Sequence, residues 1–201
     1  MPSNFLLHEW TQLRWCLDSN VIDDESADEL LCLADLGWVW LSVTDTAHFE
    51  ASQNPAKHAR LLGLLERYDV VLGPFTIGHS SLHMSIIASD DDDERHRTVH
   101  RLLWPNADFA ADGREDSRTG KNRFRDSMHV STAIRYVLTG FVTQDTRVLN
   151  GAALVAEHFD RFAVVNIADA ISRSKTAARR VRVAAAVHGQ PDPASIPEWP
   201  A

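Results

Sequence analysis

The chain has 201 residues, which is long enough for one domain with a substantial buried core. Its hydrophobic fraction of 44% and charged fraction of 24% are ordinary for a soluble globular protein, and no stretch approaches the ~20 apolar residues of a membrane span. The formal net charge of −8 argues against a surface that attracts nucleic acid everywhere, but it is compatible with a local basic strip and with carboxylates gathered around a cation.

Apolar strands and helices alternate in the first part of the chain. Residues 11–17 and 38–43 are compact apolar runs, and the aromatic and β-branched residues of the second run favour a buried strand. Residues 25–37 between them carry apolar side chains at helical spacing and stop at a glycine. The next elements are a helix at 55–68, which begins with proline and carries a leucine stripe, and a short strand at 69–74.

The segment 75–121 is the least regular part of the chain. Residues 79–89 have a helical pattern. Residues 90–104 predict a helix with an acidic first turn and basic residues further on, which is the order that the helix dipole favours. Residues 105–122 are rich in glycine, aspartate, asparagine and serine, which predicts a loop.

Regular alternation returns at residue 123. Residues 123–140 carry apolar side chains on one helical face and end in glycine, and a short strand at 141–143 follows directly. The remaining predicted elements are a helix at 147–159, a strand at 162–167, a basic helix at 168–189 and a proline-rich tail at 190–201.

The predicted strands are apolar throughout instead of alternating between apolar and polar residues. This pattern is typical of a parallel sheet covered by helices on both faces, so we expect a three-layer α/β/α fold with a central, mostly parallel sheet. We expect a main domain at 1–168, with an insertion near 90–121, and a basic helix with a proline-rich tail at 169–201. In such sheets the functional site lies beyond the carboxyl ends of the strands.

Carboxylates stand where that edge is expected. Asp18 comes directly after the first strand, and Asp145 comes just after the strand at 141–143. Asp126 lies near the start of the helix that precedes this strand. Taken singly, each acid fits a turn or a helix cap. Gathered at one edge, they would raise each other's pKa unless a cation joined them, and Mg²⁺ and Mn²⁺ prefer oxygen ligands of this kind.

Two motifs resemble those of the PIN-domain nucleases. "LDSNVI", residues 17–22, is similar to the family's opening motif, an aspartate followed by a small hydroxyl residue and often by asparagine. "RDSMHVSTAIRY…GFVTQD" is similar to its second half, in which an aspartate opens a helix with a nearby histidine and alanine, and a strand then ends in Thr-x-Asp. The similarity extends over residues 11–168 and includes the order of strands and helices. It implies a metal-dependent ribonuclease with three or four acids in its active site.

The resemblance places three acids at matching positions: Asp18, Asp126 and Asp145. The family's second acid is usually a glutamate in the helix after the second strand. Glu50 lies two residues later than the commonest spacing, and His48 occupies that place. Asp45 stands just after the strand, where a helix cap would account for it. We therefore favour Glu50 over Asp45 as the fourth acid.

The resemblance also implies the chemistry of the site. The four acids would hold one or two Mg²⁺ or Mn²⁺ ions, which would lower the pKa of a water that attacks the phosphodiester and would stabilise charge on the leaving oxygen. Ser19, Asn20 and Thr143 are candidates to orient the ligands or their waters. Hydrogen bonding within a turn or at a strand end is the alternative explanation for these three residues.

Basic residues gather in two places. The first group precedes Asp126 and would line the approach to the site, where it would contact phosphates without selecting a base sequence. Its members are Arg114, Arg118, Lys121, Arg123 and Arg125. The second group lies in the last helix: Arg173, Lys175, Arg179, Arg180 and Arg182. The alternative for both groups is a solvated charged face.

Histidine pairs offer a weaker alternative site. His79 and His83, like His96 and His100, are four residues apart, so each pair could form half of a zinc site on a helix. No cysteine lies near either pair. His129 is better explained as a packed or supporting residue than as a general base. The acidic run 90–94 lacks the ligand pattern and glycine of a calcium loop, so we expect a solvated insertion there.

The sequence leaves several functions open. The leading one is a PIN-type endoribonuclease acting on RNA. One role for such an enzyme is the toxin of a toxin–antitoxin pair, and the candidate partners are an antitoxin protein and a second copy of the chain. The alternatives are a catalytically degenerate PIN-like module that binds RNA or protein, and a phosphatase or receiver-like protein, although the phosphatase D-x-D pattern is missing at Asp18 because Asn20 follows it. Cys16 and Cys32 lie in apolar surroundings and the N-terminus does not resemble a signal peptide, so we expect a cytoplasmic protein.

Overall fold

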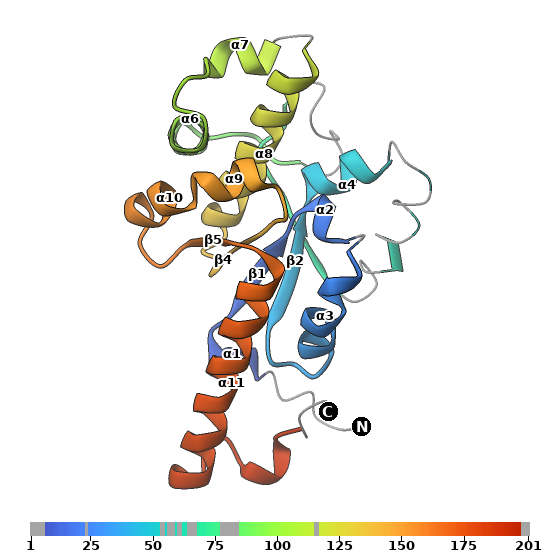
Figure 1. Ribbon diagram of the computed structural model, residues 1–201, viewed down its shortest axis with the longest axis vertical. Coiled ribbons are helices and arrows are strands. Elements are labelled where there is room, and N and C mark those ends of the chain that lie inside the picture. The colour runs from blue at the N-terminus through green and yellow to red at the C-terminus, as the bar shows by residue number, and fades with distance from the viewer. Residues whose placement is uncertain are drawn as a thin grey trace.

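The centre of the molecule is a five-stranded sheet (Figure 1), seen in a computed structural model that describes residues 7–22, 24–52, 55, 59, 62–63, 68–76, 85–114 and 117–197. The strands run in the order β3-β2-β1-β4-β5, and every neighbouring pair is parallel. They are β1 (Arg14–Leu17), β2 (Trp40–Thr44), β3 (Asp69–Val71), β4 (Gly140–Val142) and β5 (Ala163–Val165). The expected central parallel sheet is confirmed.

Helices cover both faces of this sheet, which confirms the three-layer fold (Figure 1). The helices are α1 (His8–Thr11), α2 (Ser19–Ile22), α3 (Asp28–Asp35), α4 (Asp45–Ser52), α6 (Asp90–Leu103), α7 (Phe109–Arg114), α8 (Arg118–Arg135), α9 (Thr146–Asn150), α10 (Ala152–His158) and α11 (Ile167–His188). Short 3-10 helices lie at Glu25–Ala27 (η1) and Pro193–Ser195 (η3). None of the helices described is long and apolar enough to cross a membrane.

Successive strand residues enter two different cores, because neighbouring side chains of a strand point to opposite faces. Trp15 and Leu17 of β1 join the core under α3 and α11, whereas Cys16 joins the core under α6, α8 and α10. In β4, Val142 joins the core under α3 and α11, and Phe141 joins the core under α6, α8 and α10. Both faces are therefore buried, which explains why the strands are apolar at every position.

The prediction of a loop at 105–122 is confirmed for residues 105–108 but wrong for most of the rest of the segment that the structure describes. The structure has α7 there, and α8 begins at Arg118 instead of near residue 123. The carboxylate of Asp112 in α7 is 1% exposed and accepts hydrogen bonds from Arg123 Nε at 2.6 Å and His100 Nε2 at 3.0 Å. Phe109 packs edge-on against His96 at 4.8 Å between ring centroids. These tertiary contacts order a segment whose own composition favours a turn.

The acidic helix predicted at 90–104 is confirmed as α6, but the expectation that residues 90–94 form a solvated insertion is wrong for Asp92. This side chain is 1% exposed and forms a capping box with Ser89. It also pairs with Arg95 at 2.7 Å and with Arg135 of α8 at 3.3 Å. Asp92 therefore fastens α6 to α8, while its neighbours Asp91 and Asp93 face solvent.

Several element boundaries differ from the prediction. The first strand begins at Arg14 because α1 precedes it. The helix predicted at 147–159 is divided at Gly151, where an added Cβ would lie 3.0 Å from Leu103 Cα. The predicted helix at 55–68 lies largely outside the described residues, as do residues 79–84 of the segment 79–89; its described part, 85–89, is not helical.

The basic C-terminal helix, α11, begins within the main body of the protein. Its buried side chains Ile167, Ala170 and Ala178 belong to the same core as β1 and α3. Trp15 Nε1 donates a buried hydrogen bond to Ser174 Oγ at 3.1 Å. Figure 1 shows the other half of α11 extending away from the sheet, at the end of the molecule opposite α6 and α7. The domain boundary at 168 stays a prediction.

Candidate active site

Asp18 stands at the carboxyl end of β1 and is 5% exposed. Its backbone N–H donates to Val142 O of β4 at 2.9 Å, which extends the pairing of these strands by one residue. The Thr143 hydroxyl, directly after β4, donates to Asp18 Oδ2 at 2.6 Å. Burial raises the pKa of Asp18, while His129 and the Thr143 hydroxyl oppose this rise. The two adjacent central strands thus fix this carboxylate at the sheet edge.

Asn20 and Thr143 connect Asp18 to the segment that carries Asp145. Asn20 Nδ2 donates to Thr143 Oγ1 at 3.3 Å, and the Gln144 N–H donates to Asn20 Oδ1 at 3.1 Å. The Asp145 N–H donates to Thr143 Oγ1 at 3.0 Å. The Thr143 hydroxyl is therefore the centre of a network that holds two of the predicted acids in fixed relative positions.

Glu50 reaches the same edge from α4. Its Oε2 accepts a hydrogen bond from Ser19 Oγ at 3.0 Å and lies 3.5 Å from His129 Nε2. Its Oε1 lies 3.8 Å from Arg125 Nη1. Burial opposes ionisation of Glu50, but the hydrogen bond and charge of His129, with help from Ser19 and Arg125, outweigh it and lower the pKa. Glu50 is therefore an ionised carboxylate beside the Asp18 segment.

Asp126 faces these acids from α8. Its Oδ2 is buried and has no hydrogen-bond partner among the described residues. Burial and the nearby carboxylate of Asp18 raise its pKa to about 8, and Asp145 and Glu50 add to the rise. The other three predicted acids thus all lie close enough to Asp126 to raise its pKa, although the four come from distant parts of the sequence.

Asp145 caps the N-terminus of α9 and is bound by an arginine of the same turn. Its Oδ1 accepts the Arg147 backbone N–H at 2.8 Å and Arg147 Nε at 3.0 Å. Its Oδ2 accepts Arg147 Nη2 as well. The side-chain hydrogen bond from Arg147 is the main cause of the lowered pKa of Asp145.

The donor set fits a hard divalent cation, because its four members are carboxylates and the buried Asp126 Oδ2 oxygen has no partner in the described part of the chain. Among the described residues, however, no three acidic, histidine or cysteine side chains are already arranged to hold a metal ion. Asp145 is turned to Arg147, and Glu50 to Ser19 and His129. Asp18, Glu50 and Asp145 therefore have protein groups as partners, whereas Asp126 Oδ2 has none among the described residues.

Asp45 has a different role from Glu50. It is 1% exposed, and it accepts the Gly73 N–H at 2.9 Å on Oδ1 and the Ser85 hydroxyl at 2.8 Å on Oδ2. Burial raises its pKa against these hydrogen bonds. Both oxygens are used to join α4 to the segments after β3, which supports Glu50 as the fourth acid of the site.

His129 supports the site in a way that the sequence indicated only in outline. It is 1% exposed, its Nδ1 lies 2.5 Å from Thr44 Oγ1, and its ring stacks on Phe141 at 5.9 Å. Burial opposes protonation of His129, but the hydrogen bond and charge of Glu50 raise its pKa. The signal was its position one helical turn after Asp126, which places both side chains on one face of α8. Thr44 and Arg147 were not predicted.

The predicted phosphate-contacting residues do not all lie at this edge. Arg125 lies beside Glu50, and its guanidinium stands over the Phe49 ring at 5.8 Å. Arg123 instead forms a two-pronged ion pair with Asp112 of α7. Arg118 is exposed and Lys121 is half-buried in the first turn of α8.

The described histidine pair has partners within the protein. His96 Nε2 lies 2.9 Å from Ser127 Oγ, and His100 Nε2 lies 3.0 Å from Asp112 Oδ2. These contacts join α6 to α7 and α8, which favours a structural role over a zinc site. His79 and His83 lie outside the described residues.

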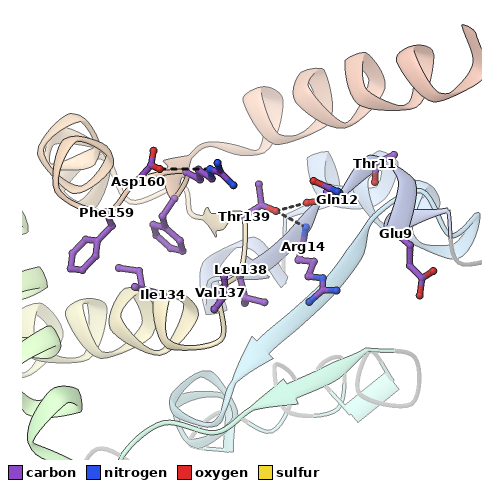
Figure 2. A pocket seen from close by; sticks show the side chains of 12 residues that line it. Glu9, Thr11, Gln12, Arg14, Ile134, Val137, Leu138, Thr139, Phe159 and Asp160 are labelled. Atoms are coloured by element: carbon purple, nitrogen blue, oxygen red, sulfur yellow. Dashed lines mark hydrogen bonds and ion pairs between the residues drawn. The ribbon is translucent and has the colours of Figure 1, made fainter. Parts of the chain in front are cut away.

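A cavity of about 770 Å³ lies at the opposite edge of the sheet, by the amino ends of β1, β4 and β5. Figure 2 shows Thr139 among the residues that line it, with the side chains of Ile134 and Phe159 on one side. The Thr139 hydroxyl donates a hydrogen bond to the Gln12 carbonyl and accepts one from the Arg14 backbone N–H. None of the predicted acids lines it. In parallel sheets the reactive groups gather at the carboxyl ends, so this cavity is separate from the acidic site.

No protein-family model and no curated protein matches the sequence. A functional assignment therefore depends on the chemistry of the acidic edge.

Proposed function

We propose that this protein is a metal-dependent endoribonuclease of the PIN-like type, which hydrolyses phosphodiester bonds of RNA. The observation that carries the proposal is the meeting of Asp18, Glu50, Asp126 and Asp145 at the carboxyl edge of a parallel sheet. Burial and the neighbouring acids raise the pKa of Asp126 to about 8, which means that its ionised form is unfavourable there. A bound cation would stabilise this ionised form, so such a carboxyl group is a candidate for a functional site.

The four acids would together hold Mg²⁺ or Mn²⁺. When bound, such an ion supplies an activated water and stabilises negative charge on the leaving oxygen. The side chains of Ser19, Asn20 and Thr143 hold the acids in place through the hydrogen bonds described above. Arg118, Lys121 and Arg125 are the proposed contacts for the RNA backbone, and Arg125 lies beside Glu50. Arg123, which the sequence also suggested for this role, is held by Asp112 instead.

The direct test is cleavage of RNA by the purified protein in Mn²⁺ or Mg²⁺. We expect Asp126→Asn to abolish cleavage, because it removes a ligand at the centre of the acid group. Asp160→Asn is the matched control, since its carboxylate is exposed at the opposite edge of the sheet. Cleavage by Asp126→Asn at the wild-type rate would reject the assignment.

A second candidate is a catalytically degenerate PIN-like module that binds RNA or a protein. Its support is that Arg147 and His129 already neutralise two of the acids. Calorimetry with Mn²⁺ distinguishes the two functions. The nuclease binds the ion and loses this binding on Asp18→Asn, whereas a degenerate module shows no binding in either protein.

The proposal includes the cytoplasmic location and the possible partners expected from the sequence. If the protein is the toxin of a toxin–antitoxin pair, its expression in bacteria arrests growth and Asp126→Asn relieves the arrest. A co-purifying small protein would identify an antitoxin, and light scattering at several concentrations would identify a homodimer.

A further inference from the structure

Asp145 already has a cation beside it, and this cation belongs to the chain itself. Arg147 Nε donates to Asp145 Oδ1 at 3.0 Å and to Oδ2 at 3.2 Å, and its Nη2 donates to Oδ2 as well. The backbone N–H of Arg147 adds a bond to Oδ1 at 2.8 Å. One residue therefore engages both oxygens of a proposed metal ligand.

The guanidinium of Arg147 stands at the border of the site and not inside it. Its side chain is 53% exposed, compared with 17% for Asp145. Because about half of the Arg147 side chain is exposed, its guanidinium would stay hydrated on releasing Asp145, so the exchange would leave no unpaired charge buried on the arginine side. Arg147 also interacts electrostatically with Asp126, whose Oδ2 has no partner in the described part of the chain.

We propose that Arg147 is the resident counter-cation of the acidic site: it holds Asp145 while the site is empty of metal, yields the carboxylate to a divalent ion, and then contacts a phosphate of the substrate strand. The inference rests on the proposed nuclease function. A guanidinium can make this exchange because its fork of N–H groups matches a phosphate as well as it matches a carboxylate. The guanidinium can leave Asp145 without breaking the N-terminal cap of α9. The cap is the hydrogen bond from the Arg147 backbone N–H to Asp145 Oδ1, which does not involve the guanidinium.

Two opposite effects follow from one substitution. Removing the guanidinium frees Asp145 for a metal ion, so metal binding becomes stronger. It also removes a phosphate contact, so binding of the RNA strand becomes weaker. Loss of a residue that only stabilised α9 would not strengthen metal binding while weakening RNA binding.

The first measurement is calorimetric titration with Mn²⁺ alone, without RNA. We expect Arg147→Gln to lower the Kd for Mn²⁺ by about two- to fivefold, which is the fold-change that loss of a competing surface ion pair corresponds to. Arg161→Gln is the matched control, because Arg161 forms an exposed pair with Asp160 away from the acids and should leave the Kd unchanged. Thermal unfolding of each variant verifies that it is folded.

The outcomes separate this inference from the function on which it rests. An unchanged or higher Kd in Arg147→Gln, with Mn²⁺ binding intact in the wild type, overturns the counter-cation role alone. Absence of Mn²⁺ binding in the folded wild-type protein contradicts the nuclease function and the inference together. Tighter binding in Arg147→Gln supports the exchange.

The second measurement is RNA cleavage at saturating Mn²⁺ over a range of salt concentrations. We expect Arg147→Gln to raise KM several-fold with a smaller change in kcat, and to reduce the slope of log KM against log salt by about 1. Arg147→Lys retains the charge without the fork and should recover part of the KM effect. An unchanged KM and salt slope would overturn the phosphate contact.

Discussion

The Thr143 hydroxyl donates a 2.6 Å hydrogen bond to the carboxylate of Asp18, which lies 125 positions earlier in the sequence. Each residue directly follows one of two adjacent parallel strands, β4 and β1, and the same hydroxyl accepts the Asp145 N–H at 3.0 Å. The position of Asp18, which follows β1, therefore depends on the segment after β4 that also carries Asp145.

Thr143→Val should remove this support while keeping the shape of the side chain. Because Asp18 is buried and would lose a hydrogen bond, we expect the free energy of unfolding to fall by about 1–3 kcal/mol and the affinity for Mn²⁺ to fall at least tenfold, on the order of effects for residues that orient metal ligands. Urea denaturation and calorimetry measure the two quantities. Thr143→Ser retains the hydroxyl and should remain close to the wild type; equal losses in both variants would contradict the role of the hydrogen bond.

Without metal, the protein should become less stable as the pH rises from 6 to about 9. The pKa of Asp126 is raised from 3.8 to about 8 by burial and by Asp18, so the folded state binds a proton that the unfolded state has already released. The stabilisation is complete below the unfolded pKa and is lost as the pH passes the folded value. Asp126→Asn should reduce this slope in urea denaturation at constant ionic strength, and a variant slope equal to that of the wild type would contradict the assignment.

Excess Mn²⁺ should reverse this pH dependence. A metal ligand must be deprotonated, so the stabilisation from bound metal increases as the pH rises through the pKa of Asp126. We expect the melting temperature to rise with Mn²⁺ more at pH 8 than at pH 6. Addition of EDTA should cancel the difference, and a Tm increase that is equal at both pH values would count against Asp126 as a ligand.

Asp112→Ala should destabilise the protein strongly, although this residue is far from the proposed chemistry. The substitution leaves Arg123 and the buried His100 without their shared carboxylate, and loss of one partner of a buried pair costs about 3 kcal/mol or more. Asp93→Ala, which removes an exposed pair with Arg97, is the control and should cost less than about 1 kcal/mol. Similar melting temperatures for the two variants would show that α7 does not depend on Asp112.

Gly151→Ala should test why α9 and α10 are separate helices. The added methyl group would lie 2.8 Å from Leu103 Cδ2 and 3.0 Å from Leu103 Cα, so α10 would have to move away from α6 at a cost of about 1–3 kcal/mol. Gly63→Ala is the control, since no atom of the described residues lies within 4 Å of its added Cβ. Denaturant unfolding measures the free energy of unfolding of both variants. An unchanged value for Gly151→Ala would show that the separation of α9 from α10 does not depend on the close approach to Leu103.

The sheet was predictable because its signal is local. Each strand is a short apolar run between turn-forming residues, and burial on both faces removes the polar alternation that an exposed sheet would show. The α7 segment was not predictable, because its glycine and aspartates favour a turn locally. The contacts that overrule this preference, such as Asp112 with Arg123, exist only once α6 and α8 have packed together.

The candidate site was predictable to the extent that its residues occupy topological positions. Asp18 and Asp145 follow strands, and the carboxyl ends of parallel strands meet at one edge. Glu50 could not be separated firmly from Asp45 by position, and it was the hydrogen bonds of Asp45 to Gly73 and Ser85 that distinguished them. Arg147 carried no signal, since an arginine in a short helix after a strand is usually a solvated side chain.

The hydrogen bond from Trp15 to Ser174 joins the first strand of the sheet to a helix near the end of the chain. A polypeptide still emerging from the ribosome can form β1 to β5 before α11 is available, but it then exposes the indole N–H of Trp15 and one face of its core. Closing this face of the core and pairing the Trp15 indole therefore both require α11.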